Sequence, residues 1–168
     1  MKNKAISAEP ALDLTTLLDH WQEHRRLTRR VIEAFPDDKF FTFSIGGMRP
    51  FAQLVMEMIT ISWPGVYGLA TGNYTVPDRP EVNFTLPPPA TKAEILRIWD
   101  HTTDEINKTW PHITAGRFQE TDKSFGMYDG KVWWHYFYFV ENEIHHRGQG
   151  YVYLRALGIE PPPFWDRH

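Results

Sequence analysis

The chain has 168 residues, of which 42% are hydrophobic, with a formal net charge of −3 and no cysteine. This length fits one domain with a substantial core, so we expect residues 1–168 to form a single domain. The charge balance and the lack of a basic stripe argue against a nucleic-acid partner. No apolar run is long enough to predict a membrane span, and no N-terminal apolar segment predicts export, so the cytoplasm is the expected compartment.

The first half of the chain predicts two helices. Residues 14–34 place apolar side chains on one stripe and Arg and Glu elsewhere, which is typical of a surface helix. A second helix is expected to start at Pro50, since the first turn tolerates a missing N–H. We expect Pro64 and Gly65 to kink or interrupt this helix, and residues 71–73 to end it.

A proline-rich connection separates the two halves. Residues 75–90 contain five prolines and predict a long, restrained crossover. Thr91 and Glu94 then form the pattern of a capping box, which predicts the start of a third helix.

The last part of the chain predicts a fourth helix after an irregular segment. Residues 114–130 contain Gly, Lys and Asp-Gly residues that favour irregular structure. A short hairpin is expected to turn at Asp129-Gly130. The fourth helix is expected over about 132–157, ending before Gly158. The predicted fold class is therefore all-α, an antiparallel four-helix bundle with a long crossover connection.

Glu57 is the most informative residue of the second helix. It is the only formally charged side chain between Arg49 and Asp78. On a helix Leu54 and Ile61 share its face, so the carboxylate is predicted to point toward the core. A buried carboxylate requires a cation, a metal, strong donors or a proton.

The fourth helix carries polar residues on an apolar face. His146 and Asn142 lie one turn apart, and Gly150 on the same face would leave room for a close backbone approach or a ligand. The other residues of this face are apolar: Phe139, Tyr153 and Leu157. His145 is rotated away and is expected at the edge of the site. Glu143 and Arg147, four residues apart, are interpreted as a pair on another face that solvates or supports the helix.

Glu57, Asn142 and His146 together predict a metal site. Because the chain has no cysteine, ligands must be N and O atoms, a set that suits Zn²⁺, Ni²⁺ or Fe²⁺ in a bundle core. The alternative is that Asn142 and His146 are hydrogen-bonded core residues and that Glu57 pairs with Arg147 or another base.

Other candidate residues have weaker patterns. His20 and His24 form a second i,i+4 pair, which we interpret chiefly as surface histidines, although His24 could reach the pocket. The aromatic run over residues 133–139 could form a pocket wall but is more typical of plain core.

The closing helix resembles that of the DinB family. The resemblance rests on residues 142–149 (NEIHHRGQ) followed by 153–159 (YLRALGI). The family's commonest pattern has three metal-binding histidines, one on the second helix and an H-x3-H pair on the last. By position His146 matches the final histidine, Asn142 stands where the first histidine of the pair would be, and Glu57 stands near the histidine of the second helix.

The resemblance implies a homodimer with a divalent metal in a cleft, acting on a small molecule as a metal-dependent hydrolase or a thiol S-transferase. His24 or His145 would be a candidate base, and no catalytic residue is assigned. The competing interpretation is a non-enzymatic, stress-associated dimeric binding protein in which Glu57 and His146 form only a structural pair.

Overall fold

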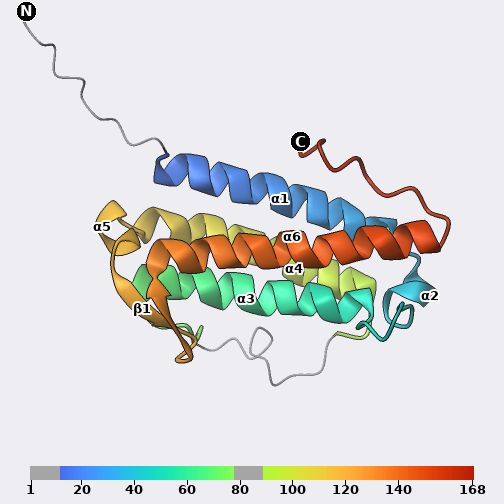
Figure 1. Ribbon diagram of the computed structural model, residues 1–168, viewed down its shortest axis with the longest axis horizontal. Helices are drawn as coiled ribbons and strands as arrows, with labels where there is room; N and C mark the ends of the chain where they lie inside the picture. Colours follow the sequence, from blue (N-terminus) through green and yellow to red (C-terminus); the bar gives the residue numbers. More distant parts are fainter. Residues whose placement is uncertain (1–11, 78–88) are drawn as a thin grey trace, which may run out of the picture.

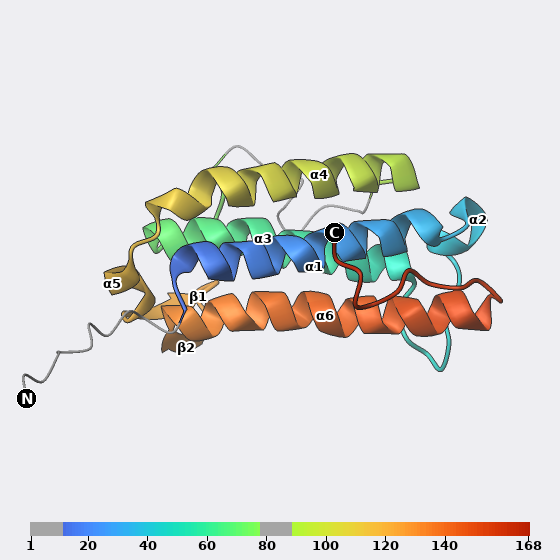
Figure 2. The ribbon, with the colours of Figure 1, turned by 90° about the horizontal axis from the view of Figure 1, so that it is seen from above.

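Four long helices make up most of the chain. The computed structural model describes residues 12–77 and 89–168, and these are mostly helical, as predicted. The long helices lie side by side in both views (Figures 1 and 2). They are α1 (Leu14–Ala34), α3 (Phe51–Thr71), α4 (Lys92–Thr109) and α6 (Val132–Ala156). Helices α4 and α6 each pack against both α1 and α3.

The helices do not simply alternate in direction. In Figure 1, α1 and α6 run one way and α3 and α4 run the other way. The contacting pairs α3–α6 and α1–α4 are antiparallel, whereas α3–α4 and α1–α6 are parallel. A parallel pair of consecutive helices requires a connection that returns along their length. Residues 75–90 were expected to form this crossover, and of these 78–88 lie outside the described part of the chain.

Short elements extend the two ends of the long helices. Helix α2 (Asp37–Phe40) follows α1, and the 3-10 turn η2 (Trp110–His112) and helix α5 (Ala115–Phe118) follow α4. A two-stranded antiparallel sheet of β1 (Thr121–Ser124) and β2 (Tyr128–Lys131) then leads into α6. This small sheet is an addition to the expected all-α fold.

The hairpin exists but its turn lies elsewhere than at Asp129-Gly130. Those two residues pair within β2, with Asp129 opposite Lys123, and the connection uses residues 125–127. Phe125 and Gly126 both have positive φ, at 53° and 69°. A Gly at the second of these positions suits the left-handed backbone, which sequence inspection had assigned to the Asp-Gly pair.

Local signals set the helix ends. The Thr91 hydroxyl accepts a hydrogen bond from the Glu94 N–H, and the Glu94 carboxylate accepts one from the Thr91 N–H, which is the predicted capping box. After α6, Gly158 has a φ of 76°, and the N–H groups of Gly158 and Ile159 bond to the carbonyls of Arg155 and Leu154. This Schellman arrangement ends the helix where predicted.

Helix α3 is not interrupted at Pro64, so the interruption that was one of the two expected outcomes is wrong. The helix continues to Thr71, and Pro64 and Gly65 are both buried. A Cβ on Gly65 would lie 2.6 Å from the Phe139 ring. The absent side chain lets α6 approach α3 closely, and the apolar surface buried there offsets the hydrogen bond that proline cannot make.

Buried apolar side chains form two clusters along the long helices. One includes Phe35, Phe51 and Tyr153, and the other, toward the hairpin, includes Trp21 and Tyr136. Along α1 and α6, buried polar residues lie between the two clusters. Among the helices that the structure describes, none is long and apolar enough to cross a membrane.

Glu143 and Arg147 belong to this buried polar layer, which corrects their interpretation as a solvated surface pair. Glu143 is 0% exposed and Arg147 is 6% exposed. The Glu143 carboxylate accepts hydrogen bonds from Thr28 Oγ1 at 2.6 Å and from Trp21 Nε1 at 3.3 Å. Arg25 lies 3.6 Å from the same carboxylate. The charges therefore join α1 to α6 inside the molecule.

His24 is also buried, so its assignment to the surface was wrong. It is 3% exposed, and its Nδ1 accepts a hydrogen bond from Arg147 at 2.9 Å. Burial, followed by the positive charge of Arg147, lowers its pKa to about 3. A neutral His24 held by Arg147 is part of the α1–α6 contact, whereas His20 is exposed as expected.

Candidate functional site

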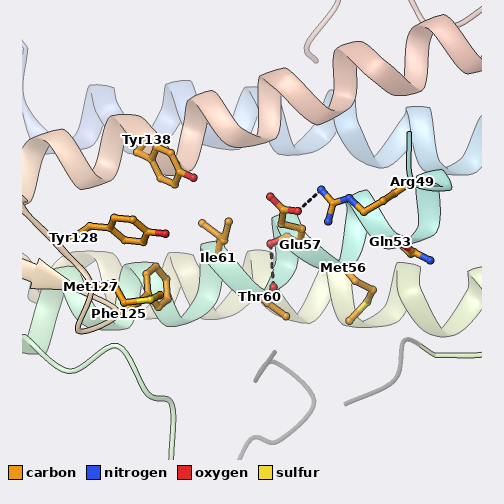
Figure 3. A pocket seen from close by; sticks show the side chains of 10 residues that line it. All are labelled: Arg49, Gln53, Met56, Glu57, Thr60, Ile61, Phe125, Met127, Tyr128 and Tyr138. Atoms are coloured by element: carbon orange, nitrogen blue, oxygen red, sulfur yellow. Dashed lines mark hydrogen bonds and ion pairs between the residues drawn. The ribbon is translucent and has the colours of Figure 1, made fainter. Parts of the chain in front are cut away.

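Glu57 lies at the edge of a cavity of about 420 Å³ (Figure 3). Its side chain is 24% exposed, so it is half-buried rather than enclosed in the core as predicted. Helix α3 and the segment before it line one part of the cavity with Arg49, Gln53, Met56, Glu57, Thr60 and Ile61. The β1–β2 hairpin and α6 add Phe125, Met127, Tyr128 and Tyr138.

The three residues of the predicted site meet at this edge. His146 Nε2 lies 2.8 Å from Glu57 Oε1, and Asn142 Nδ2 donates a hydrogen bond to the same oxygen at 3.1 Å. Asn142 and His146 are buried on the α6 face that helical spacing predicted. The spacing argument therefore placed a carboxylate, an amide and an imidazole from two helices together.

Arg49 is a fourth member that sequence reasoning missed. Its guanidinium lies 2.5 Å from Glu57 Oε2, and its side chain is half exposed. The sequence interpretation allowed a base other than Arg147 as the partner of Glu57, and Arg49 is that base. The sequence signal was weak, since Arg49 stands in the segment before α3, where helical spacing does not apply.

The contact between His146 and Glu57 requires a hydrogen or a metal ion between their atoms. His146 Nδ1 lies 2.7 Å from Gln149 Oε1, while the Gln149 amide nitrogen faces the Met48 sulfur. In this arrangement Nδ1 carries a hydrogen, which in a neutral imidazole leaves Nε2 as an acceptor. Two acceptors 2.8 Å apart repel each other. The pair is favourable when a proton sits on Nε2 or when a metal ion takes the place of that proton.

The charge of Glu57 is stabilised where it stands. Its pKa is lowered to about 2, first by the hydrogen bond with His146, against the opposing effect of burial, and further by Arg49 and Asn142. A carboxylate that stays ionised over the whole physiological range is a suitable partner for a cation.

The donor set fits a metal only in part. Asn142 Oδ1 is buried and has no hydrogen-bond partner among the described residues, so it is a third oxygen available to a cation. Within residues 12–77 and 89–168, however, no group of three or more His, Asp or Glu side chains converges as a metal site would. Amide oxygens are weaker ligands than imidazole, and Glu57 Oε2 already bonds to Arg49. The residues fit a weak cation site with two strong donors.

The remaining predicted residues lie apart from this cluster. His145 is exposed beside His146, and His24 is occupied by Arg147. Gly150 does leave room for a close approach, but a protein side chain fills it, since a Cβ there would lie 2.5 Å from the Phe51 ring. Neither histidine bonds to Glu57, so neither is placed as its base.

The aromatic run over 133–139 divides between core and surface. His135, Tyr136 and Phe139 are buried, whereas Trp134 and Tyr138 are 47% and 43% exposed. Tyr138 lines the cavity beside Glu57, and both of these exposed residues line a second, smaller cavity of about 160 Å³. The run is therefore partly a pocket wall and partly core.

Comparisons with known proteins bear on the family and on the fold. The sequence model of the DinB family matches residues 89–167, which include α4, the hairpin and all of α6. This part of the chain is similar to the DinB family. No curated protein matches the chain.

Two solved DinB-like structures share the fold. The crystal structure of a DinB-like protein from Bacillus subtilis has a TM-score of 0.71 and 17% identity, over 90% of this chain and 99% of that one. A DinB-like protein from Bacillus cereus has a TM-score of 0.69 and 14% identity, over 89% of this chain and 95% of that one. The resemblance of the closing helix to DinB proteins is thus confirmed, and the DinB fold extends over nearly the whole chain.

Proposed function

We propose that this DinB-like protein binds a divalent metal, Zn²⁺, Ni²⁺ or Fe²⁺, through Glu57, Asn142 and His146. Acting on a small molecule in the adjoining cavity, it would be a metal-dependent hydrolase or a thiol S-transferase. The observation that carries the proposal is the 2.8 Å approach of His146 Nε2 to Glu57 Oε1, two ligand-type atoms that need a hydrogen or a metal ion between them. The four long helices would form a DinB-type bundle around this site.

Each residue of the cluster has a distinct role. A bound divalent metal would supply Lewis acidity that lowers the pKa of a water or thiol in the cavity. Gln149 fixes the orientation of His146 through Nδ1, leaving Nε2 directed at Glu57. Arg49 holds the second carboxylate oxygen of Glu57, and the free Asn142 Oδ1 offers an additional donor.

A second candidate is favoured by Arg49. Its ion pair with Glu57, together with the bonds from Asn142 and His146, provides a complete set of partners for the carboxylate without a metal. In this case His146 donates an Nε2 hydrogen to Glu57, the cluster is a structural pair, and the cavity belongs to a non-enzymatic, stress-associated binding protein.

Metal content distinguishes the two candidates. The purified chain is stripped with EDTA, incubated with Zn²⁺, Ni²⁺ or Fe²⁺, desalted and analysed by mass spectrometry. We expect one ion per chain for one of these metals, and loss of that ion in His146→Ala and Glu57→Gln. The matched control is His145→Ala, because His145 is exposed beside His146 and should leave binding unchanged. Failure of all three metals to bind the wild type would leave the structural pair as the function of the cluster.

We further propose that the protein is a homodimer in the cytoplasm, as the resemblance implies. Trp133 and Phe137 on α6 support a protein partner: they are 38% and 37% exposed, and their ring centroids lie 6.3 Å apart. Sedimentation equilibrium of the wild type and of Phe137→Glu tests this, since a charge in a dimer interface should give a monomer.

A further inference from the structure

The Glu57 cavity adjoins a second compartment with aromatic walls. The second cavity, of about 160 Å³, shares Phe125, Tyr128 and Tyr138 with the Glu57 cavity and adds Trp134 as its fourth aromatic wall. Ser124 and His135 complete the lining of this aromatic compartment. In Figure 3 the shared aromatic residues stand at one end of the cavity and Arg49 and Glu57 at the other. The two adjoining cavities, called the joined space below, therefore have an aromatic end and a polar end.

The aromatic walls are open to solvent, which is unusual for such large side chains. Tyr128, Trp134 and Tyr138 are 56%, 47% and 43% exposed. The Trp134 and Tyr138 rings lie nearly parallel, with centroids 6.1 Å apart and an interplanar angle of 21°. A ligand that covers these ring faces would remove apolar surface from water, which favours binding.

The hairpin holds Phe125 in an unfavourable backbone conformation. Phe125 has a φ of 53°, a left-handed conformation that costs a residue other than glycine on the order of 1–2 kcal/mol. The ring packs against Tyr74 and Phe139, with centroids 5.1 and 6.1 Å away. A strained residue that forms a cavity wall is typical of a binding site, because the strain persists only where the surroundings hold it.

The charges of the joined space decide which ligand fits the aromatic compartment. Among the described lining residues, the formally charged side chains are Arg49 and Glu57, and they pair with each other at 2.5 Å. Neither belongs to the aromatic compartment. The compartment therefore has no counter-charge for an ionic group, which favours a neutral ring over an ammonium group or a carboxylate.

We propose that Phe125, Tyr128, Trp134 and Tyr138 bind the neutral aromatic ring of a small molecule whose polar group reaches Glu57 and His146. This inference rests on the proposed function in that both concern the same joined cavity, and it adds the substrate class. The volume is appropriate, since an apolar cavity of about 150 Å³ accommodates benzene. Ring contacts with aromatic walls add to the free energy of burial, whereas a saturated ring gains burial alone.

The test compares two probes that differ only in the ring. N-benzylacetamide and N-(cyclohexylmethyl)acetamide are titrated into the EDTA-treated protein, and binding is followed by protein-detected NMR. The extra energy of aromatic contacts predicts that the benzyl probe binds about 2- to 10-fold more tightly. Equal or weaker binding of the benzyl probe, or no binding of either, overturns the proposal. Choline is the third probe, and tighter binding of choline would overturn it in favour of a cation site.

Variants locate the binding on the aromatic compartment. Trp134→Leu and Tyr128→Leu should each weaken binding of the benzyl probe several-fold, so that it no longer binds more tightly than the cyclohexyl probe. Both residues are exposed, so these variants should fold. Trp165→Leu is the matched control, because Trp165 is also an exposed tryptophan and lines neither cavity. An equal loss in Trp165→Leu would place the probe outside the aromatic compartment.

The outcome is separable from that of the metal proposal. Because the titration uses metal-free protein, ring selectivity should persist in His146→Ala even though that variant cannot hold a metal. Metal binding without ring selectivity rejects only the aromatic site, and ring selectivity without metal binding rejects only the metal.

Discussion

His24 Nδ1 accepts a hydrogen bond of 2.9 Å from the guanidinium of Arg147, so the imidazole must be neutral for the contact to form. The same arginine donates to the His24 carbonyl and to Thr28, and Arg167 of the C-terminal tail lies 3.5 Å from His24 Nε2. Protonation of His24 would place a third positive charge among two arginines in a buried setting.

Stability should therefore fall as the pH drops from 7 to 5. Burial and the charges of Arg147, Arg167 and His20 lower the His24 pKa from 6.5 to about 3. The unfolded chain binds a proton here below about pH 6.5 and the folded chain does not, so the stabilisation is present above pH 6.5 and is lost as the pH falls. Between pH 7 and pH 5 the loss should be about 2 kcal/mol, measured by urea denaturation.

Substitution of His24 tests the origin of that dependence. His24→Gln keeps an acceptor for Arg147 but cannot titrate, so its unfolding free energy should change by about 2 kcal/mol less over this range. His112→Gln, at an exposed site in η2 away from His24, should behave like the wild type. Glu57 does not interfere, because its pKa is lowered from 4.5 to about 2 and its contribution is lost only as the pH falls below about 4.5. An unchanged pH dependence in His24→Gln would show that other groups are responsible.

Neutralising Glu143 should be among the most damaging single changes in the chain. Glu143→Gln leaves Arg25 and Arg147 buried without their anion, so we expect a loss of about 3–5 kcal/mol in unfolding free energy. Glu141→Gln is the matched control: it lies two residues away on the exposed face of α6 and should change stability by less than about 0.5 kcal/mol. Similar denaturation midpoints for the two variants would contradict the buried ion layer.

Thermal melts of Glu57→Gln, with and without EDTA, distinguish a metal ligand from a structural partner. If Glu57 holds a metal, the chelator should lower the melting temperature of the wild type, whereas Glu57→Gln should be insensitive to it. If Glu57 is only a partner of His146 and Arg49, the wild type should ignore EDTA. The variant should then lose about 1–3 kcal/mol in both conditions, since buried donors are left unpaired.

Two glycines of α6 should respond in opposite ways to alanine. A Cβ on Gly150 would lie 2.5 Å from the Phe51 ring, so Gly150→Ala should cost about 1–3 kcal/mol through overpacking. Among the described residues, a Cβ on Gly148 would have no neighbour within 4 Å beyond its own stretch of helix. Gly148→Ala should therefore stabilise the helix by roughly 0.5–1 kcal/mol. Chemical denaturation of both variants measures the difference, and equal effects would contradict the close approach of α3 to α6 at Gly150.

The helix ends and the meeting of Glu57 with His146 could be predicted from sequence because each depends on local signals. The capping box at Thr91 and the Gly158 cap after α6 each depend on residues close together in the chain. Glu57 could be identified because it is a single charged residue in an apolar helix. Arg49 was missed because its half-exposed side chain reaches Glu57 from the segment before α3, where no periodic pattern applies.

The buried ion layer could not be derived with the same rules. Whether Glu143 and Arg147 face water or the core depends on Trp21, Arg25 and Thr28 of α1, which lie more than a hundred residues away in sequence. A partial signal existed, since Glu143 and Arg147 share their helical face with Tyr136, Val140 and Leu154, all buried. We nevertheless interpreted Glu143 and Arg147 as a solvated pair, because charged residues four apart on a helix more often lie at its surface.

The bonds between α1 and α6 connect residues 115 to 123 positions apart, from Thr28 with Glu143 to His24 with Arg147. If either α1 or α6 separates from the rest of the fold, the buried charges of the other helix therefore lose their partners. Partial opening from one end of the chain would expose unpaired ions, so it should be as costly as global unfolding. The slowest-exchanging amide protons of α1 and α6 should then share one protection free energy, equal to that of the whole domain.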